Sequence, residues 1–567
     1  MNRTEGRAGL DPVTVEVIRN KLDGIANEME LTLVQSAFST IVKEGLDASA
    51  SLFTLKGETL AQAIAIPIHL VTLLPIVRHL LDQKPVAEMK EGDAFVMNDP
   101  YLGGTHLPDI AVMMPVFHEG RPIAISATMT HHQDVGGMTP GSTPTNATEI
   151  FQEGLRIPLL TLMREGRLNE TFLAILRGNV RIPDTVTGDL MAETSACSIG
   201  ARRLQEVAAT YGANFLASVF DELLGRSEKM TREALRRIPE GAYSYTDYLD
   251  NDGVDLDRKV PIRVTARIAD GAVEFDFKGT SPQVRGPFNC VPSGSLAAAC
   301  FAVRAVTDPE ELIPNNGGCF RPVSLKLPPG SIVNPREPAP VGCRTSTIKR
   351  VTSVILGALR KGMPERVPAD PAGEEVILHF GGRRADGGGF VTSQILIGGS
   401  GAAREADGVD VIETDATNCM NIPAEALELE APIRVHRASL APDSGGPGEH
   451  RGGLGAWLEY EILDGEMTAT YRGERHFCQA AGAERGEAGG RASAEIVRGD
   501  GSVHAIPSKE VVRMQAGDRL IVRTAGGGGF GEPSKRPHDR IRADIENGKV
   551  TAEAAARAYG LPLRSVE

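Results

Sequence analysis

The sequence predicts a multi-domain α+β protein, in which helices and sheets of mixed order share one chain. The chain has 567 residues, and at roughly 100 to 200 residues per domain this length accommodates about three or four folding units. Helical and strand-like periodicities alternate before about residue 430, and glycine-rich strands follow. The regions that we expect are an N-terminal region of helix and hairpins (1–242), a central mixed α/β region (243–430), a glycine-rich β region (431–535) and a C-terminal helical tail (536–567).

The N-terminal region begins with a long amphipathic helix. Asp11 followed by Pro12 is typical of a helix start, and apolar residues then recur at spacings of three and four from Val15 to Leu33. A turn at Lys56-Gly57 predicts a hairpin after the helix. The elements expected in order are this hairpin (48–54 and 59–66), a buried helix (67–81), a short strand (94–98) and a second hairpin (110–116 and 123–129) joined through Glu119-Gly120.

The remaining elements follow from the same periodicities. Residues 136–158 are irregular and contain Pro140 and Pro144, and loops of this length inside compact domains are usually functional or disordered. Further elements are expected as helices (169–180, 186–211, 215–238, 293–306), a hairpin (260–268 and 272–277), C-terminal strands (458–463, 519–523) and two short polar helices (539–547 and 551–559).

Charge and composition exclude several classes of protein. Acidic residues outnumber basic ones by 74 to 60, which gives a net charge of −14 and argues against a nucleic-acid partner, because phosphate binding needs a basic face. No stretch approaches the 18 or so uninterrupted apolar residues of a membrane span, so we expect no membrane partner and a cytoplasmic location. The seven cysteines form no C-x-x-C pair and are expected to be free, buried thiols.

Two short segments of the N-terminal region concentrate histidine and carboxylate side chains. The first carries His106 and Asp109, and the second carries His131, His132 and Asp134. Neutral imidazole and carboxylate form a ligand set that suits Zn, Mn or Fe(II) and leaves a position for substrate. The segments therefore predict a metal site. The alternative is that these residues only cap loops and turns, since no fixed motif such as H-E-x-x-H is present.

The second hairpin brings both segments to one edge, but spacing alone leaves its register open. A two-residue turn at Glu119-Gly120 places Asp109 opposite Thr130 and on the face of His132. A three-residue turn that includes Arg121 places Asp109 directly opposite His131. Because one residue of register moves every side chain to the other face of a sheet, spacing does not choose between the two histidines.

The glycine-rich end does not predict a nucleotide site. Residues 526–531 formally match G-x-G-x-x-G, but a dinucleotide fingerprint opens a helix, whereas Glu532-Pro533 follows here. We interpret these glycines as turn-forming. The phosphate-binding pattern G-x-x-x-x-G-K-[ST] is absent from the sequence, so no ATP cradle of that kind is expected.

With these motifs the sequence resembles the hydantoinase B/oxoprolinase family, whose members are the B-type chains of bacterial hydantoinase/oxoprolinase enzymes, over about residues 10–535. The motifs that carry the resemblance are NDPYLGGTHLPD (98–109), HHQDVGG (131–137), PGSTPTNATEIFQEGLRIP (140–158), DFKGTSPQ (276–283), PNNGG (314–318), PGSIVNP (329–335), SGGPG (444–448), RGGLG (451–455) and residues 526–531. One such motif is weak evidence, and the set together is specific.

The resemblance implies a function and a set of site residues. It implies ATP-dependent opening of a cyclic amide, such as a hydantoin or 5-oxoproline, by metal-assisted hydrolysis. The family's metal ligands carry over onto Asp47, His106, Asp109 and His131, which favours the register with Asp109 opposite His131. The metal expected there is one divalent ion, Zn or Mn or else Fe. His132 and Asp134 are then the candidates for proton transfer or for orienting the ligands.

The resemblance also implies a partner and leaves alternatives. An A-type subunit is expected to carry ATP-Mg, so that the two chains form a heterotetramer or a larger complex. One alternative is a subunit of an ATP-dependent ketone carboxylase, of the acetone or acetophenone type, that uses the same metal. Another is a non-catalytic scaffold that positions the ATP-binding partner and needs no metal.

Overall fold

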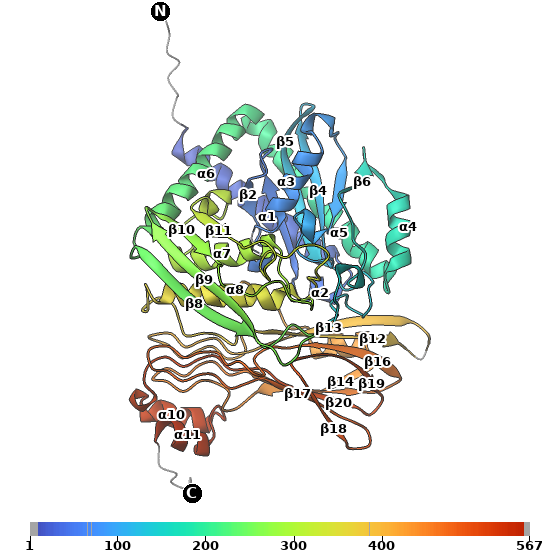
Figure 1. Ribbon diagram of the computed structural model, residues 1–567. Helices are drawn as coiled ribbons and strands as arrows, with labels where there is room; N and C mark the ends of the chain where they lie inside the picture. The colour runs from blue at the N-terminus through green and yellow to red at the C-terminus, as the bar shows by residue number, and fades with distance from the viewer. Residues whose placement is uncertain (1–9, 65, 70, 385, 561–567) are drawn as a thin grey trace, which may run out of the picture.

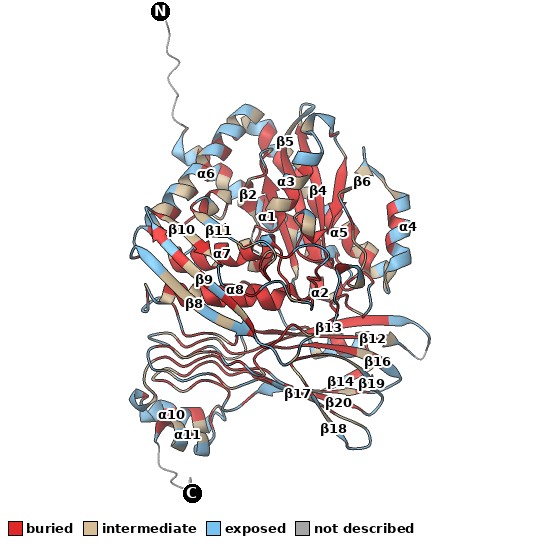
Figure 2. Cartoon of the chain, viewed as in Figure 1, coloured by how far each residue is buried: buried red, intermediate tan, exposed pale blue. Residues whose placement is uncertain are grey.

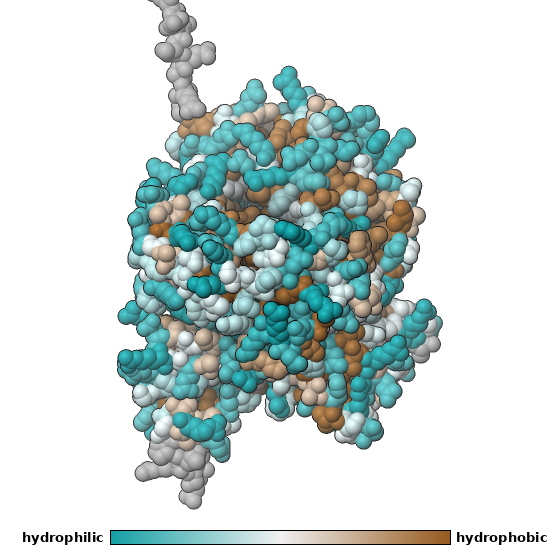
Figure 3. All heavy atoms as spheres, in the orientation of Figure 1, coloured by the Kyte–Doolittle hydropathy of each residue, from teal (hydrophilic) through white to brown (hydrophobic). Residues whose placement is uncertain are grey.

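The computed structural model describes residues 10–64, 66–69, 71–384 and 386–560. Figure 1 shows the N-terminal two thirds of the chain, which contain most of the helices, above a layer of strands from the C-terminal third, with the last two helices at its edge. In Figure 2 the buried residues follow the central strands of the upper part and the interface between the two parts. The face seen in Figure 3 is largely hydrophilic, with scattered apolar areas. No helix in the described ranges is both long and apolar enough to cross a membrane.

A seven-stranded sheet with the order β2-β1-β5-β4-β3-β6-β7 forms the centre of the N-terminal part. Helices α1 and α5 pack on one face, and α3 covers the other with an apolar cluster that includes Ile76 and Met129. The central strands β4 and β5 are therefore buried on both faces. The elements here are α1 (Pro12–Ser36), α2 (Thr40–Lys43), β1 (Ala48–Phe53), β2 (Thr59–Gln62), α3 (Leu73–Gln83), β3 (Ala94–Met97), β4 (Asp109–His118), β5 (Arg121–His131), β6 (Leu160–Arg164), β7 (Arg167–Leu168), α4 (Glu170–Asn179), α5 (Pro183–Tyr211) and α6 (Ala213–Leu235).

The hairpin of β4 and β5 combines features of both expected registers. Its turn has two residues, because His118 pairs with Arg121 and Glu119 and Gly120 both have positive φ, as a tight hairpin turn requires. A β-bulge next to Val116 then shifts the pairing by one residue, and Asp109 faces His131. The register that the resemblance favoured is correct, and a bulge rather than a longer turn produces it.

The central part is a four-stranded sheet, β11-β10-β9-β8, on which two helices pack. Helix α8 is one of them, and the sequence periodicity did not predict it. The helix is buried on nearly all sides: Ile348, Val351 and Ile355 recur at helical spacing, and Arg344, Lys349 and Arg350 are buried with them. The elements are β8 (Gly241–Leu249), β9 (Val260–Ala269), β10 (Ala272–Asp276), α7 (Pro292–Thr307), β11 (Val323–Lys326) and α8 (Arg344–Arg360).

The C-terminal part contains a four-stranded sheet, β13-β12-β16-β19, and a five-stranded sheet, β14-β15-β20-β17-β18, which share one apolar core. Strands β12 and β13 precede residue 430 and pair with each other, and β12 also pairs with β16, which follows that residue. The elements are β12 (Glu375–Arg383), β13 (Gly389–Ile397), α9 (Ala424–Glu430), β14 (Ile433–Leu440), β15 (Ala456–Ile462), β16 (Glu466–Arg472), β17 (Ser493–Val497), β18 (Val503–Ile506), β19 (Lys509–Gln515), β20 (Arg519–Arg523), α10 (His538–Glu546) and α11 (Ala552–Tyr559).

The glycine run after β20 lies between other backbones rather than in a turn. None of Gly526 to Gly529 has a positive φ, and a Cβ atom at any of them would lie 1.8–2.2 Å from a backbone carbonyl oxygen of a neighbouring segment. Amide groups of Gly527 and Gly528 donate to Gly453 and Asp370. The turn interpretation is therefore wrong for these four residues, since glycine is required here for close packing of extended segments.

Most expected elements are present near their predicted bounds. The segment expected as one helix over 67–81 is instead a short 3-10 turn (Pro67–His69) followed by α3, which begins at Leu73. All seven cysteines are free and buried, as predicted. The mixed helix and sheet composition and the several sheets confirm the α+β class.

Candidate metal centre

The rim of the β4–β5 hairpin brings three potential ligand atoms together. His106 Nε2 lies 2.9 Å from Asp109 Oδ1 and 3.1 Å from His131 Nδ1, and His131 Nδ1 lies 3.2 Å from the same carboxylate oxygen. All three residues are buried. Asp109 begins β4 and His131 ends β5, so the bulged register places them opposite each other, and His106 precedes β4 by one turn of loop.

The hydrogen bond of His106 Nδ1 sets the tautomer of the ring, and that tautomer suits this group of atoms for binding a metal ion. His106 Nδ1 is 2.9 Å from the carbonyl oxygen of Gly342, to which it can only donate. In the neutral ring Nε2 then carries a lone pair, and that lone pair faces Asp109 Oδ1. Two acceptors at this distance repel each other, and a shared cation removes the repulsion. A backbone acceptor behind a ligating histidine is the usual arrangement in metal sites.

The charges next to the cluster keep its donor atoms unprotonated. Asp109 Oδ2 accepts hydrogen bonds from the Thr105 hydroxyl and the Arg344 guanidinium. Burial opposes ionisation of Asp109, but the Arg344 guanidinium beside it outweighs burial and holds the pKa of this carboxyl well below its usual range. Burial, together with the charge of Arg344, lowers the pKa of His106 to about 3. Metal ligands must be deprotonated, and this environment favours that state.

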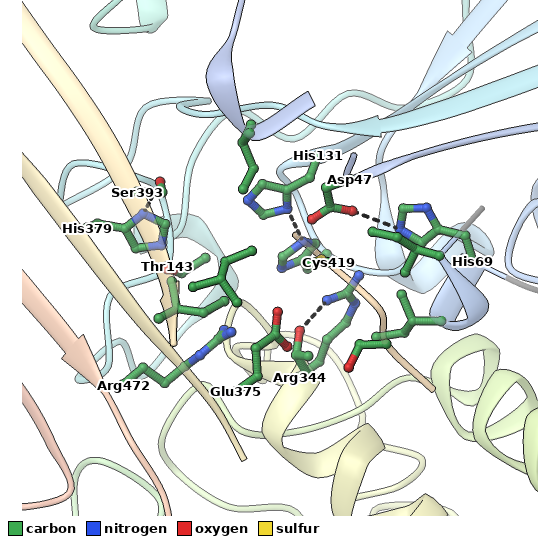
Figure 4. A pocket seen from close by; sticks show the side chains of 18 residues that line it. Asp47, His69, His131, Thr143, Arg344, Glu375, His379, Ser393, Cys419 and Arg472 are labelled. Atoms are coloured by element: carbon green, nitrogen blue, oxygen red, sulfur yellow. Dashed lines mark hydrogen bonds and ion pairs between the residues drawn. The ribbon is translucent and has the colours of Figure 1, made fainter. Parts of the chain in front are cut away.

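Asp47 and a histidine that the sequence motifs did not single out lie beside the three converging residues. His69 Nε2 is 3.7 Å from Asp47 Oδ1 and 3.8 Å from Asp109 Oδ2, and Figure 4 shows the Asp47–His69 pair on the same side of the cavity as His131. Asp47 is held there because its carbonyl oxygen accepts the amide hydrogen of His131. Its side chain lies outside the tight group of His106, Asp109 and His131.

His132 and Asp134 face away from this cavity. His132 Nε2 is 3.3 Å from Glu193 Oε2 on α5, and both side chains are fully buried. Asp134 accepts hydrogen bonds from the backbone of Gly136 and from the backbone and side chain of Arg181. Both residues follow His131 at the end of β5, and their contacts hold the segment that continues from this strand.

The C-terminal sheet closes the cavity opposite the candidate metal ligands. Glu375, Ile377 and His379 alternate on one face of β12, and their cross-strand neighbours include Ser393 on β13 and Arg472 on β16. This face lines one cavity of about 30 Å³ together with Asp47, His106 and His131. Figure 4 shows Arg472, Glu375 and His379 on one side of it and His131, Asp47 and His69 on the other.

Sequence reasoning missed several residues that line this cavity. His69 lies in an apolar segment, where a histidine is usually a core residue. Arg344, His379 and Arg472 lie more than 200 residues beyond the metal motifs, on elements that pack against them only in the folded chain. The segment 341–345, Val-Gly-Cys-Arg-Thr, offered one signal, an isolated arginine among small and apolar residues.

Comparisons with known proteins agree on one family. The model of the hydantoinase B/oxoprolinase family matches residues 11–533. The chain is 30% identical to the putative B-type chain of the D-/L-hydantoinase of Pseudomonas sp. (strain NS671), over 98% of this chain and 96% of that protein. It is 33% identical to the beta chain of the caprolactamase of Pseudomonas jessenii, over 97% and 96% of the two chains.

Two solved structures share the fold over nearly the whole chain. A chain of the ATP-dependent caprolactamase from Pseudomonas jessenii superposes with a TM-score of 0.91 at 30% identity, and the match covers 98% of this chain and 97% of that one. A chain of nucleotide-free acetone carboxylase gives a TM-score of 0.90 at 19% identity, over 98% and 80% of the two chains. At 19% identity, the match to acetone carboxylase shows a shared fold alone.

Proposed function

The chain belongs to the hydantoinase B/oxoprolinase family, and from this premise we propose that it is the metal-binding subunit of an ATP-dependent enzyme that hydrolyses a cyclic amide. The observation that carries the proposal is the convergence of His106 Nε2, His131 Nδ1 and Asp109 Oδ1 in a buried cavity. The relatives named as hydantoinase and caprolactamase subunits support the substrate class, a hydantoin-like ring or a lactam.

We assign the metal to His106, Asp109 and His131, with Asp47 as the fourth ligand that the family resemblance implies. A bound divalent ion supplies polarisation of a carbonyl group and a water molecule of lowered pKa. Zn and Mn suit the nitrogen and oxygen donors equally, as does Fe(II). Arg344 keeps Asp109 ionised, and Gly342 holds the His106 ring in the tautomer that leaves Nε2 free.

Of the two roles expected for His132 and Asp134, their contacts support positioning rather than proton transfer to substrate. His132 is bonded to Glu193, and Asp134 is bonded to Arg181 and to nearby backbone. His69 is the better placed group for proton transfer, because it lines the cavity beside Asp47 and Asp109.

We further propose that ATP-Mg binds a separate A-type subunit and that the two chains form a heterotetramer or a larger complex. The support is that the relatives are themselves named as single subunits of their enzymes and that the sequence lacks the common phosphate-binding motif. On this proposal the purified chain alone hydrolyses no ATP.

The test replaces metal ligands and counts metal. His106→Ala and His131→Ala should each abolish stoichiometric metal, measured by elemental analysis, and ring opening by the reconstituted complex. The matched control is His118→Ala, at the opposite end of the same hairpin, where metal content and activity should persist. Full metal content in both ligand variants would refute the assignment. Activity is followed as ATP hydrolysis in a screen of hydantoins and lactams, and incorporation of labelled hydrogencarbonate would instead identify a carboxylase.

A further inference from the structure

Arg472 is a buried cation without a partner. It ends β16 and lies opposite Ile377 of β12, on the sheet face that closes the cavity. Its residue is 1% exposed, and within the described part of the chain none of its three guanidinium nitrogens has a hydrogen-bond partner. An unpaired buried charge is costly.

The other fully buried arginines of the described chain differ from Arg472. Arg350 and Arg475 both form ion pairs with Asp247, at 2.7 and 3.0 Å. Arg451 lies 3.3 Å from Asp410. Each of these charges is matched by a carboxylate of the protein, as is that of Arg344, which also lines the cavity. Arg472 is the exception among these buried arginines.

A second polar group on the same sheet face is also unpaired. His379 Nδ1 is 2.7 Å from the Ser393 hydroxyl, while its Nε2 is buried and has no partner among the described residues. His379 and Arg472 lie on neighbouring strands, and Figure 4 shows both side chains at the cavity, across from the metal ligands. Glu375 lies on the same face, but among the described residues no hydrogen bond joins its carboxylate to Arg472.

We propose that Arg472, assisted by His379, binds the carboxylate-type oxyanion of a ligand whose other end meets the metal centre. A guanidinium fork matches a planar carboxylate through two parallel hydrogen bonds. The cavity of about 30 Å³ has room for about two or three water-sized groups, since one water needs about 10–15 Å³. That room fits about the three heavy atoms of one carboxylate group.

The proposal rests on the proposed function and names the chemistry of its ligand. Hydrolysis of a cyclic amide breaks the C–N bond and adds the water oxygen to the carbonyl carbon. One water proton goes to the nitrogen, and the other is released as the new acid ionises to a carboxylate. Free hydrogencarbonate is the other source of the same planar anion. In both cases Arg472 recognises an anion that lies next to the metal, so it is a specificity-determining residue.

The test follows ¹³C line broadening of [1-¹³C]acetate and of ¹³C-hydrogencarbonate, in separate arms, with the full-length purified chain. Wild-type protein should broaden at least one signal, and the arm that responds identifies the source. Arg472→Met should weaken binding roughly tenfold or more, as expected for a charge-assisted pair. The binding control is Arg513→Met, an exposed arginine of neighbouring β19, which should bind as wild type does.

Stability separates a ligand-binding arginine from a structural one. Without acetate, Arg472→Met should melt at or above the wild-type temperature, because the variant loses an unpaired buried charge. Arg475→Met loses a paired charge and should melt lower. Undiminished broadening in Arg472→Met, or competition by inorganic phosphate that exceeds that of acetate, would overturn the proposal. Should Arg472→Met not fold, Arg472→Lys replaces it: reduced acetate broadening supports the proposal and wild-type broadening overturns it.

Metal analysis of the same samples keeps this test distinct from that of the proposed function. Arg472→Met should retain the metal content of the wild type, whatever its anion binding. Loss of anion binding with full metal content supports Arg472 as the anion site. Absence of metal from wild type would contradict the proposed function and leave the acetate result to judge Arg472 alone.

Discussion

A single methyl group added to the glycine layer, the run Gly526–Gly529 that packs between neighbouring backbone segments, should destabilise the protein strongly. The substitution is Gly527→Ala. A Cβ atom at Gly527 would lie 1.9 Å from the carbonyl oxygen of Ser400, about 1.5 Å closer than the 3.4 Å at which ordinary van der Waals contact begins. The obstacle is backbone, so no side-chain rotation relieves it, and the two segments must separate.

Separation breaks backbone hydrogen bonds on both sides of the residue. Gly527 donates to Gly453 at 3.0 Å and accepts from Gly446 at 2.8 Å. Each buried group left without its partner costs about 1–3 kcal/mol, so two bonds correspond to a loss of about 2–6 kcal/mol in the free energy of unfolding. A loss of this size should lower the midpoint of guanidinium unfolding, followed by far-UV circular dichroism.

The same substitution elsewhere should have the opposite sign. Gly225 lies on the exposed side of α6, and a Cβ atom there meets nothing within 4 Å. Alanine is favoured over glycine in a helix by about 1 kcal/mol, so Gly225→Ala should raise the midpoint slightly. A Gly527→Ala protein that unfolds at the wild-type midpoint would refute the reasoning, since the clash would then have been accommodated at no cost.

Two further predictions concern buried carboxylates. Glu153 accepts the amide hydrogens of Val341 and Gly342, and Gly342 in turn holds the His106 ring. Glu153→Gln should therefore weaken metal binding roughly 10- to 100-fold, measured by competition with a chromophoric chelator. The control is the exposed Glu149→Gln, and equal metal affinities of the two variants would contradict the prediction. Burial raises the pKa of Glu374 from 4.5 to about 8, so its contribution to stability is complete below about pH 4.5 and is lost as pH rises through 8. Between pH 6 and 9 the wild type should lose about 3 kcal/mol that Glu374→Gln retains, measured by urea unfolding; parallel pH profiles would argue against it.

The local periodicity of the sequence was enough to predict most elements. The helix that begins after Asp11 and the hairpins of the N-terminal region form where apolar spacing and turn residues place them. Helix α8 was missed although Ile348, Val351 and Ile355 recur at helical spacing. Its Arg344 and Lys349 are buried because they reach partners elsewhere in the fold. Spacing rules predict the hydrophobic face of an element, and they do not show which charged residues are buried beside a partner from another element.

For the candidate site, too, local sequence predicted one part and tertiary packing decided the other. His106, Asp109 and His131 could be predicted as a group because a hairpin joins them, and the resemblance selected the register. The reason for that register, a β-bulge next to Val116, depends on how the hairpin packs in a sheet buried on both faces. No local pattern of residues specified it.

The sequence by itself determined the family, the α+β class and three residues that converge at the candidate metal centre, because hairpins and helices are set by neighbours a few residues apart. The tertiary structure decided what faces that centre. Arg472, His379 and Arg344 come from strands and a helix more than 200 residues away, and the glycine layer permits segments of the C-terminal part to approach within backbone distance. Such contacts depend on which surfaces pack together. Only the packed structure shows that Arg472 is buried without a hydrogen-bond partner among the described residues.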